Sequence, residues 1–251
     1  MNDWTKRRAD FRTLHAEGCF VLPNPWDTGS ARRLEALGFK ALASSSSAAA
    51  LVLGLTDYQL SLDQCLDHLE MLCRSTALPV NADFENGFAH NVEGVAENVT
   101  RAIATGIAGI SIEDQHGGVL YPLDLAVARI AAARTAIDSS GADVMLVART
   151  EGRLWGLSDR QEAIDRLVAF AAAGADCLYA PGVTAPDEIS NIVRAVSPKP
   201  VNVLLMNPEM YVVDLAALGV RRVSTGGALA NAAWRGFDKA ADALATNAGL
   251  A

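Results

Sequence analysis

Short apolar runs recur along the chain, and most are followed by a stretch whose apolar positions have helical spacing. The runs that predict strands are residues 20–23, 41–45, 79–84, 109–113, 144–149, 177–180, 200–205 and 222–225. Helical patterns lie between them, as in residues 61–75, 92–105, 125–139 and 159–173. Short strands that alternate with helices are typical of parallel βαβ units. Eight such strands predict a single (β/α)8 TIM-type barrel.

A glycine-bearing turn repeats just before several of these strands. Its copies are Leu37-Gly38, Thr105-Gly106, Ala173-Gly174 and Leu218-Gly219. Glycine after a helix takes the left-handed conformation, ends the helix and returns the chain to the sheet. Four copies of one device indicate repeated units of one fold.

The two ends of the chain add helices to the predicted barrel. Residues 4–17 predict an extra helix that caps the barrel bottom, and residues 228–245 predict a last helix. We find no linker or break in composition, so we predict one domain over residues 1–251.

Composition and charge narrow the possible partners. The chain has 251 residues, 51% of them hydrophobic, and a formal net charge of −8. Without a run of Lys or Arg it is a poor candidate for binding nucleic acid or an anionic membrane. The charged first twenty residues resemble neither a signal peptide nor a membrane span, so we expect a cytoplasmic protein. The four cysteines lack metal-ligand spacing and are interpreted as small core residues.

Polar residues gather late in the predicted strands, where a TIM barrel carries its active site. Side chains alternate along a strand, so Asn81, Asp83 and Glu85 are expected on one face. The fourth strand ends with Glu113 and the fifth with Arg149. We therefore expect these groups to converge at one mouth of the barrel.

Three of these side chains offer the oxygen ligands that Mg²⁺ or Mn²⁺ accepts. They are Asp83, Glu85 and Glu113. Burying a carboxylate is costly unless it is paired with a cation or bound to a metal. Arg149 adds a planar donor fork suited to a carboxylate or phosphonate. The alternative is that these groups form ion pairs that close the barrel mouth.

Other candidate residues follow the first, second, fourth and seventh strands. Serine hydroxyls and amides after the second strand can hold carboxylate oxygens, although a plain polar turn is the alternative. Trp26 walls the pocket or simply covers the barrel rim. His116 is a candidate proton donor or else a surface loop residue. The expected substrate-binding residues are Trp26, Asp27, Ser44, Ser45, Ser46, Asn81 and Asn202.

Five segments, in order and at similar spacing, resemble those of the isocitrate lyase and phosphoenolpyruvate mutase superfamily. They are residues 24–31, 44–57, 81–83, 112–115 and 148–150. The resemblance implies a barrel that uses a divalent metal and a metal-bound enolate of pyruvate or a close relative. It also implies a homodimer or homotetramer in which subunits exchange the last helix, here residues 228–245.

The chain departs from the superfamily pattern in three places. Asn81 replaces the first metal aspartate. Residues 115–120 lack the Cys that serves the lyases as general acid, and also the Lys and Asn of phosphonopyruvate-processing members. Pro181 stands near the place of a sixth-strand Glu. The superfamily assignment survives these changes, whereas the particular reaction stays open.

The sequence thus favours a metal-dependent carbon–carbon lyase or decarboxylase that acts on a small anionic 2-oxo acid or 2-hydroxy acid adduct and releases pyruvate or a similar acid. Its catalytic residues are predicted to be Arg149, Glu113 and His116. The alternatives are a P–C bond hydrolase or mutase and a catalytically silent metabolite-binding barrel. A Schiff-base aldolase is excluded because no lysine lies at the carboxyl end of a predicted strand.

Overall fold

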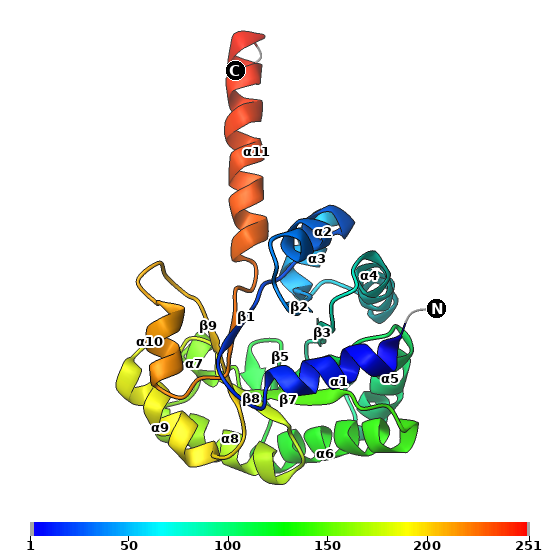
Figure 1. Cartoon of the computed structure of the whole chain (residues 1–251), viewed down its shortest axis with the longest axis vertical. Coiled ribbons are helices and arrows are strands. Elements are labelled where there is room, and N and C mark those ends of the chain that lie inside the picture. Colours follow the sequence, from blue (N-terminus) through cyan, green and yellow to red (C-terminus); the bar gives the residue numbers. More distant parts are fainter. Residues whose placement is uncertain (1–2, 250–251) are drawn as a thin grey trace.

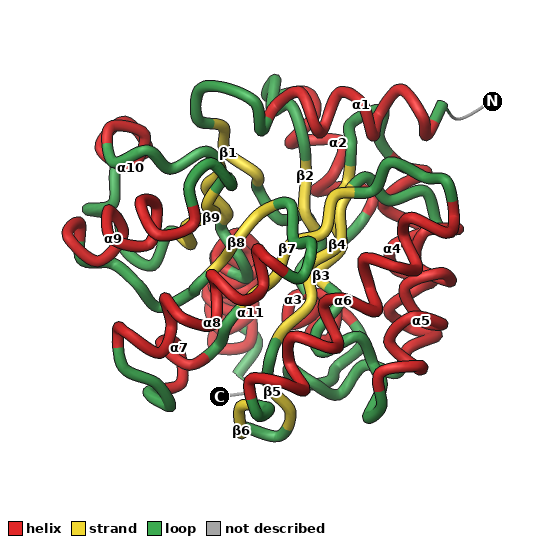
Figure 2. The backbone as a smooth tube through the Cα atoms, turned by 90° about the horizontal axis from the view of Figure 1, so that it is seen from below, coloured by secondary structure: helices red, strands yellow, loops and turns green. Residues whose placement is uncertain are grey.

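The computed structural model describes residues 3–249, within which eight parallel strands form a nearly closed barrel (Figure 2). Their order around the sheet is β1-β10-β9-β8-β7-β4-β3-β2. Each strand lies inside a predicted apolar run, which confirms the (β/α)8 TIM-type barrel. The strands are β1 Phe20–Leu22, β2 Leu42–Ala43, β3 Val80–Asp83, β4 Gly109–Glu113, β7 Met145–Arg149, β8 Cys177–Tyr179, β9 Val201–Leu204 and β10 Arg222–Ser224.

Asn24 ties together the two ends of the sheet. The backbone N–H of Ala43 donates to Pro23 O at 3.1 Å, so one main-chain bond joins the segments of β1 and β2. The Asn24 amide nitrogen donates to Ser44 O at 2.7 Å, and its amide oxygen accepts from Gly226 N at 2.8 Å. One side chain therefore links the ends of β1, β2 and β10.

A ring of helices surrounds the barrel (Figure 2). The predicted helices are confirmed, and their ends agree with the sequence pattern to within three residues. A small hairpin, β5 Gln115–His116 and β6 Val119–Leu120, follows β4. The ring helices are α2 Thr28–Ala36, α3 Ser46–Val52, α4 Leu62–Ser75, α5 Val92–Ala104, α6 Leu123–Ser140, α7 Gly152–Trp155, α8 Arg160–Ala172, α9 Pro186–Val196 and α10 Val212–Ala217.

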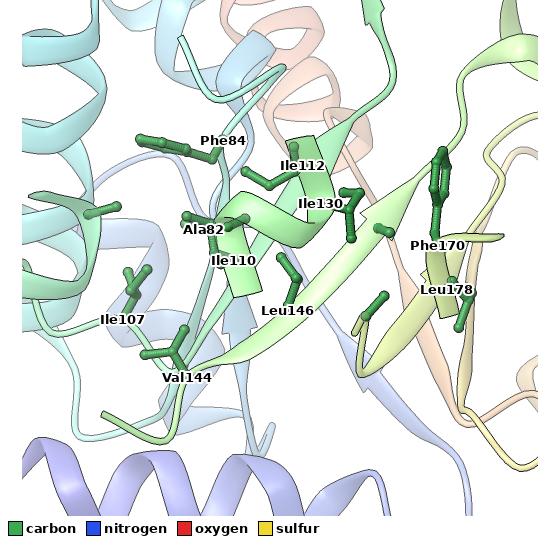
Figure 3. Packing of buried hydrophobic residues seen from close by; sticks show 14 of the residues in the cluster. Ala82, Phe84, Ile107, Ile110, Ile112, Ile130, Val144, Leu146, Phe170 and Leu178 are labelled. Carbon is green, nitrogen blue, oxygen red and sulfur yellow. The ribbon is translucent and has the colours of Figure 1, made fainter. Parts of the chain in front are cut away.

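The main core lies between the strands and the helices (Figure 3). Ile110 and Ile112 of β4 are fully buried in it, as is Leu146 of β7. The residues that alternate with them, such as Ser111, face the barrel interior. Each buried aliphatic side chain contributes about 1.5–3 kcal/mol. The outward apolar faces therefore hold the barrel together and leave its interior free for polar groups.

The first helix, α1 Trp4–Leu14, closes the bottom of the barrel, as predicted. Phe11 is fully buried and packs against Leu22 and Met145. A Cβ atom at position 109 would lie 2.6 Å from the Phe11 ring, so Gly109 makes room for the aromatic side chain. Arg8 Nε also donates to Ile107 O at 3.0 Å.

The last helix, α11 Ala228–Asn247, extends away from the barrel (Figure 1). Its apolar residues Trp234, Phe237 and Leu244 are exposed, and Ala230 is its buried residue. None of the helices within residues 3–249 is both long and apolar enough to span a membrane.

We expect Phe11→Ala to destabilise the barrel by about 3–5 kcal/mol, because it removes the aromatic plug and leaves a cavity. Urea unfolding followed by circular dichroism measures this loss. Leu37→Ala is the control, since Leu37 is 75% exposed and its truncation should change the free energy of unfolding by no more than about 0.5 kcal/mol. Equal losses in both variants would contradict the plug.

Candidate active site

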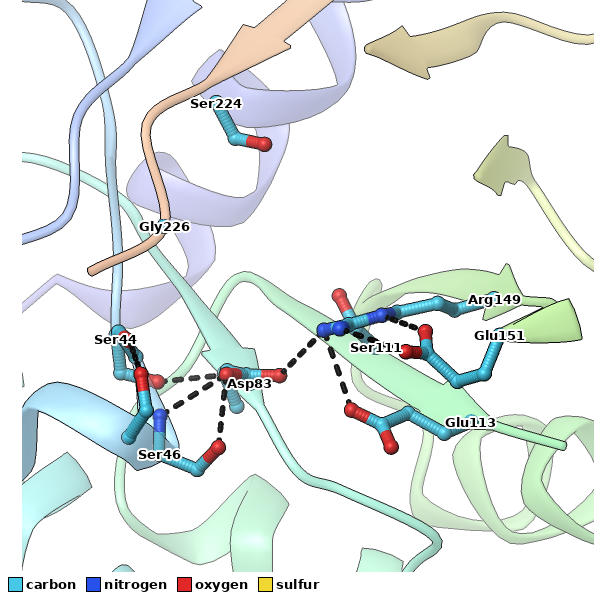
Figure 4. A network of polar contacts seen from close by, with 12 residues as sticks. Ser44, Ser46, Asp83, Ser111, Glu113, Arg149, Glu151, Ser224 and Gly226 are labelled. Carbon is cyan, nitrogen blue, oxygen red and sulfur yellow. Dashed lines mark hydrogen bonds and ion pairs between the residues drawn. The ribbon is translucent and has the colours of Figure 1, made fainter. Parts of the chain in front are cut away.

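Arg149 is the centre of a charged cluster at the carboxyl ends of β3, β4 and β7 (Figure 4). It lies opposite Glu113 in the register of β4 and β7. Its Nη1 is 3.2 Å from Glu113 Oε1 and 3.3 Å from Asp83 Oδ1. Its Nε and Nη2 contact the Glu151 carboxylate. One guanidinium thus holds three carboxylates. Asp83 and Glu113 were expected to converge on it, whereas Glu151 was not, and Glu85 forms no ion pair with Arg149 among residues 3–249.

Asp83 is held from its other side by the turn between β2 and α3. Its Oδ2 accepts from Ser46 N at 2.9 Å and from Ser46 Oγ at 3.1 Å. Its own backbone N–H donates to Ser44 Oγ at 2.8 Å. Ser45 instead begins α3, because its Oγ accepts from Ala48 N at 3.3 Å. The serine run therefore fixes the carboxylate as well as the turn.

Glu113 is 2% exposed and receives two further hydrogen bonds. Its Oε2 accepts from Tyr58 OH at 3.0 Å and from Gln115 Nε2 at 3.2 Å. Burial raises the pKa of Glu113, and the Arg149 guanidinium opposes that rise. Burial alone would lower the pKa of Arg149, but the surrounding carboxylates raise it well above its usual value. The guanidinium therefore stays charged and fixed in place.

A small cavity, here called the inner cavity, lies inside the barrel next to Arg149. Its volume is about 40 Å³. Asn81 lies in its wall, where its amide nitrogen donates to Ser111 Oγ at 3.0 Å. Its lining residues are Asn24, Ala43, Ser44, Asn81, Asp83, Ser111, Arg149, Tyr179, Arg222, Ser224 and Gly226.

A larger cavity of about 500 Å³, here called the outer cavity, is lined by Tyr58 and Gln115 beside the cluster. Glu85 and His116 also line it. Glu85 has a left-handed backbone (φ 43°) beyond the end of β3, so the expected alternation with Asn81 and Asp83 stops at Asp83. His116 lies on the β5–β6 hairpin, with its ring edge-on to His90 at 5.0 Å.

Five of the seven expected substrate-binding residues line neither cavity: Trp26, Asp27, Ser45, Ser46 and Asn202. Trp26 and Asp27 line a separate cavity of about 340 Å³ beside α3 and α4. The Asp27 carboxylate caps α2, because its Oδ1 accepts from Ser30 N at 2.6 Å. Asn202 is buried in the barrel interior, where its amide nitrogen donates to Ser224 Oγ at 3.0 Å.

Three residues of the site were missed by the sequence analysis. Tyr58 lies in an irregular segment after α3, where no periodic pattern marks it. Glu151 comes two residues after Arg149, beyond the end of β7. Arg222 is a charged residue inside a predicted apolar strand, and that anomaly was an available signal. Its guanidinium donates to Asn81 Oδ1 at 3.2 Å.

The carboxylates of the mouth match a divalent cation in chemistry, although they do not form a finished site. Glu85 Oε1 is buried and has no hydrogen-bond partner among the described residues. Burial raises the pKa of Glu85 to about 8, and the nearby Asp83 and Asp57 add to the shift. Excess negative charge on oxygen donors is what Mg²⁺ or Mn²⁺ relieves. Within residues 3–249 no three His, Cys, Asp or Glu side chains converge on one point. The donors therefore fit such an ion only if further oxygens come from elsewhere.

The chain matches known proteins over nearly its whole length. The phosphoenolpyruvate phosphomutase family matches residues 11–245. An uncharacterized protein of Mycobacterium tuberculosis is 34% identical over 86% of this chain and 81% of its own length. The oxaloacetate decarboxylase of Chromohalobacter salexigens is 34% identical over 87% of this chain and 78% of its own length.

Solved structures also match the fold over nearly the whole chain. A candidate lyase or mutase of Burkholderia cenocepacia J2315 is 44% identical, with a TM-score of 0.92 over 95% of this chain and 88% of its own. Oxaloacetate acetylhydrolase in complex with its product oxalate is 26% identical, with a TM-score of 0.87 over 95% of this chain and 86% of its own.

We expect Glu85→Gln to remove part of the pH dependence of folding stability. The folded-state pKa of Glu85 is about 8, above the ordinary 4.5, so the folded chain holds a proton that the unfolded chain has lost. The free energy of unfolding of the wild type should therefore fall as the pH rises from about 4.5 to 8. Urea unfolding in excess chelator measures the change in the free energy of unfolding between pH 5 and pH 9. This fall should be smaller by about 1–3 kcal/mol in Glu85→Gln than in the wild type.

Glu209→Gln is the matched control, because Glu209 is exposed and the same substitution there should leave the pH dependence unchanged. If the free energy of unfolding of Glu85→Gln falls with pH as steeply as that of the wild type, Glu85 is ionised in the folded protein throughout this range.

Proposed function

The chain belongs to the phosphoenolpyruvate phosphomutase family, whose match covers residues 11–245, and on that premise we propose a particular reaction for it. We propose that it is a divalent-metal-dependent carbon–carbon lyase or decarboxylase. Its substrate is a small 2-oxo diacid, such as oxaloacetate, or a 2-hydroxy acid adduct, and its product is pyruvate or a similar oxo acid. The observation that carries this proposal is Arg149, a fixed cation in the wall of the inner cavity whose side chain is 14% exposed.

Arg149 stabilises the charge that develops on the substrate. Decarboxylation breaks the bond between C3 and the departing carboxyl carbon, CO₂ leaves, and the electron pair becomes an enolate. The guanidinium attracts the enolate oxygen or the neighbouring carboxylate. Because Glu113, Asp83 and Glu151 already hold its orientation, it needs little reorganisation during the reaction.

Asp83, with Glu85 or Glu113 directly or through water, would hold the metal, and the remaining ligands would come from the substrate. A divalent cation there supplies positive charge that polarises the 2-oxo group. Asn81 offers no negative charge, so we expect the metal to bind weakly without substrate. Tyr58 and Gln115 orient the Glu113 carboxylate from the other side.

The proton that completes the product reaches C3 from the outer cavity. Decarboxylation needs no dedicated acid, because water can protonate the enolate after CO₂ has left. Cleavage of a larger hydroxy acid needs a proton donor, and His116 in the outer cavity is our candidate. A P–C bond hydrolase or mutase is the alternative within the family. It is less favoured because residues 115–120 lack the Lys and Asn of phosphonopyruvate-processing members, and His116 is the only ionisable residue in that segment.

We also propose a homodimer or homotetramer assembled through α11. Trp234 and Phe237 form an edge-to-face pair on this projecting helix, with ring centroids 5.9 Å apart. Exposed aromatic side chains of this kind are enriched at interfaces between subunits.

Arg149→Ala should lower kcat/KM for every substrate by about 10²–10³-fold or more, because it removes the fixed cation. His116→Ala should slow carbon–carbon lysis more than decarboxylation. Pyruvate release from oxaloacetate and from methylisocitrate-type hydroxy acids, in excess Mg²⁺, measures both effects.

Arg160→Ala is the control for the lost guanidinium, because Arg160 forms a surface ion pair with Asp187 at 2.8 Å and should be replaceable without loss of activity. Full activity in Arg149→Ala would end the enolate mechanism. A P–C bond hydrolase would instead release pyruvate and phosphate from phosphonopyruvate alone, and a mutase would isomerise phosphonopyruvate to phosphoenolpyruvate without releasing pyruvate.

Metal dependence has its own test in ligand binding. Oxalate mimics the enolate of pyruvate, so its affinity measured by calorimetry should rise on addition of Mg²⁺ and fall in excess chelator. Mg²⁺ alone should bind weakly because position 81 carries an amide. Equal oxalate affinity with Mg²⁺ and with chelator would show that the metal has no role.

A further inference from the structure

Arg222 is a buried cation whose hydrogen bonds go to neutral groups. It lies on β10 with 2% of its surface exposed. Its Nε donates to Asn202 Oδ1 at 2.8 Å and its Nη1 to Asn81 Oδ1 at 3.2 Å. Arg149 is surrounded by three carboxylates, whereas Arg222 has no carboxylate ion pair among residues 3–249.

The surroundings of Arg222 leave its charge uncompensated. A charged group out of water is costly unless an opposite charge or hydrogen bonds replace its solvent. Burial lowers the pKa of Arg222, and Asp83, Tyr179 and Cys177 oppose this from a distance. A guanidinium nevertheless remains protonated inside proteins. The barrel interior therefore carries one positive charge that the two amide contacts do not neutralise.

Arg222 also reaches the inner cavity, together with Arg149. A cavity needs about 10–15 Å³ for each water-sized group, so its volume of about 40 Å³ holds about three such groups. That is the size of one carboxylate. The hydroxyl groups of Ser111 and Ser224 line the same space. Size, charge and hydrogen-bonding groups therefore match one small anionic group.

We infer that Arg222 is a substrate-binding residue, and that the inner cavity accepts one carboxylate of the substrate between Arg222 and Arg149. This inference rests on the proposed function, because it names the part of the 2-oxo acid that enters the barrel. The rest of the substrate then lies toward the outer cavity, which has the larger volume. Only the carboxylate head is confined, so the enzyme selects acids by that head more strictly than by the rest of the molecule.

Ser224→Asp tests the inference by placing a carboxylate of the protein itself in the inner cavity. Ser224 is 6% exposed, lines the inner cavity and contacts Asn202, the amide that also binds Arg222. An aspartate there places a carboxylate next to the guanidinium. Oxalate affinity, measured by calorimetry in excess Mg²⁺, should fall about 10- to 100-fold, the loss of one charge-assisted hydrogen bond.

Ser224→Asn is the matched control for size, since asparagine fills the same space without the charge that neutralises Arg222, and its oxalate affinity should fall at least about threefold less than that of Ser224→Asp. Arg222→Met should weaken oxalate binding as Ser224→Asp does. If Arg222→Met fails to fold, the two Ser224 variants still decide. Wild-type affinity in Ser224→Asp, equal losses in both Ser224 variants, or no oxalate binding by the wild type would each overturn the inference.

Turnover separates this inference from the proposed function. If the wild type does not decarboxylate oxaloacetate but its oxalate affinity depends on the charge at position 224, the reaction is wrong and the subsite stands. If oxaloacetate is turned over and oxalate binds Ser224→Asp as it binds the wild type, the reaction stands and the subsite is wrong.

Discussion

The guanidinium of Arg149 shares its donors among three carboxylates, and each carboxylate is fixed to a different part of the barrel mouth. Asp83 holds the turn before α3 through Ser46, and Glu113 holds the segment after α3 through Tyr58. Glu151 follows β7 directly, and its backbone N–H donates to Asp114 Oδ1 at 2.9 Å. Removing one buried charge from such a cluster leaves the others unpaired. The arrangement of the mouth therefore depends on one side chain, which also faces the substrate in the proposed reaction.

Regular structure made most of the fold and part of the site predictable. All eight strands follow from short apolar runs, and Glu113 and Arg149 are placed by the parallel register of neighbouring strands. Strand alternation gives no guide where the backbone leaves that register. Glu85 lies past the end of β3 with a positive φ, so strand alternation no longer sets its direction. Tyr58 also has a positive φ, in a segment without periodicity, and only the folded chain brings it to Glu113.

The amide at position 81 contacts Arg222, the second arginine of the barrel interior. Asn81 accepts from Arg222 and donates to Ser111, so it is satisfied on both sides without carrying charge. A carboxylate in its place would pair with Arg222 and neutralise it. The amide that offers no charge to the proposed metal is therefore the same one that leaves Arg222 without an opposite charge in the barrel interior. The neutral amide of Asn81 and the buried positive charge of Arg222 therefore belong to one electrostatic arrangement.

Asn24 joins the first and last strands of the barrel, and this contact bears on how the chain folds during synthesis. The partners of Asn24 just after the last strand, Thr225 and Gly226, lie 201 and 202 residues later in the sequence. At about 5–20 residues per second, a ribosome needs roughly 10–40 s to make the intervening chain. Throughout that time β1 lacks its neighbour β10, and an unpaired strand edge is prone to aggregation. Barrel closure is thus a late, long-range event, and the nascent chain depends on chaperones or on early burial of this edge by the first helix.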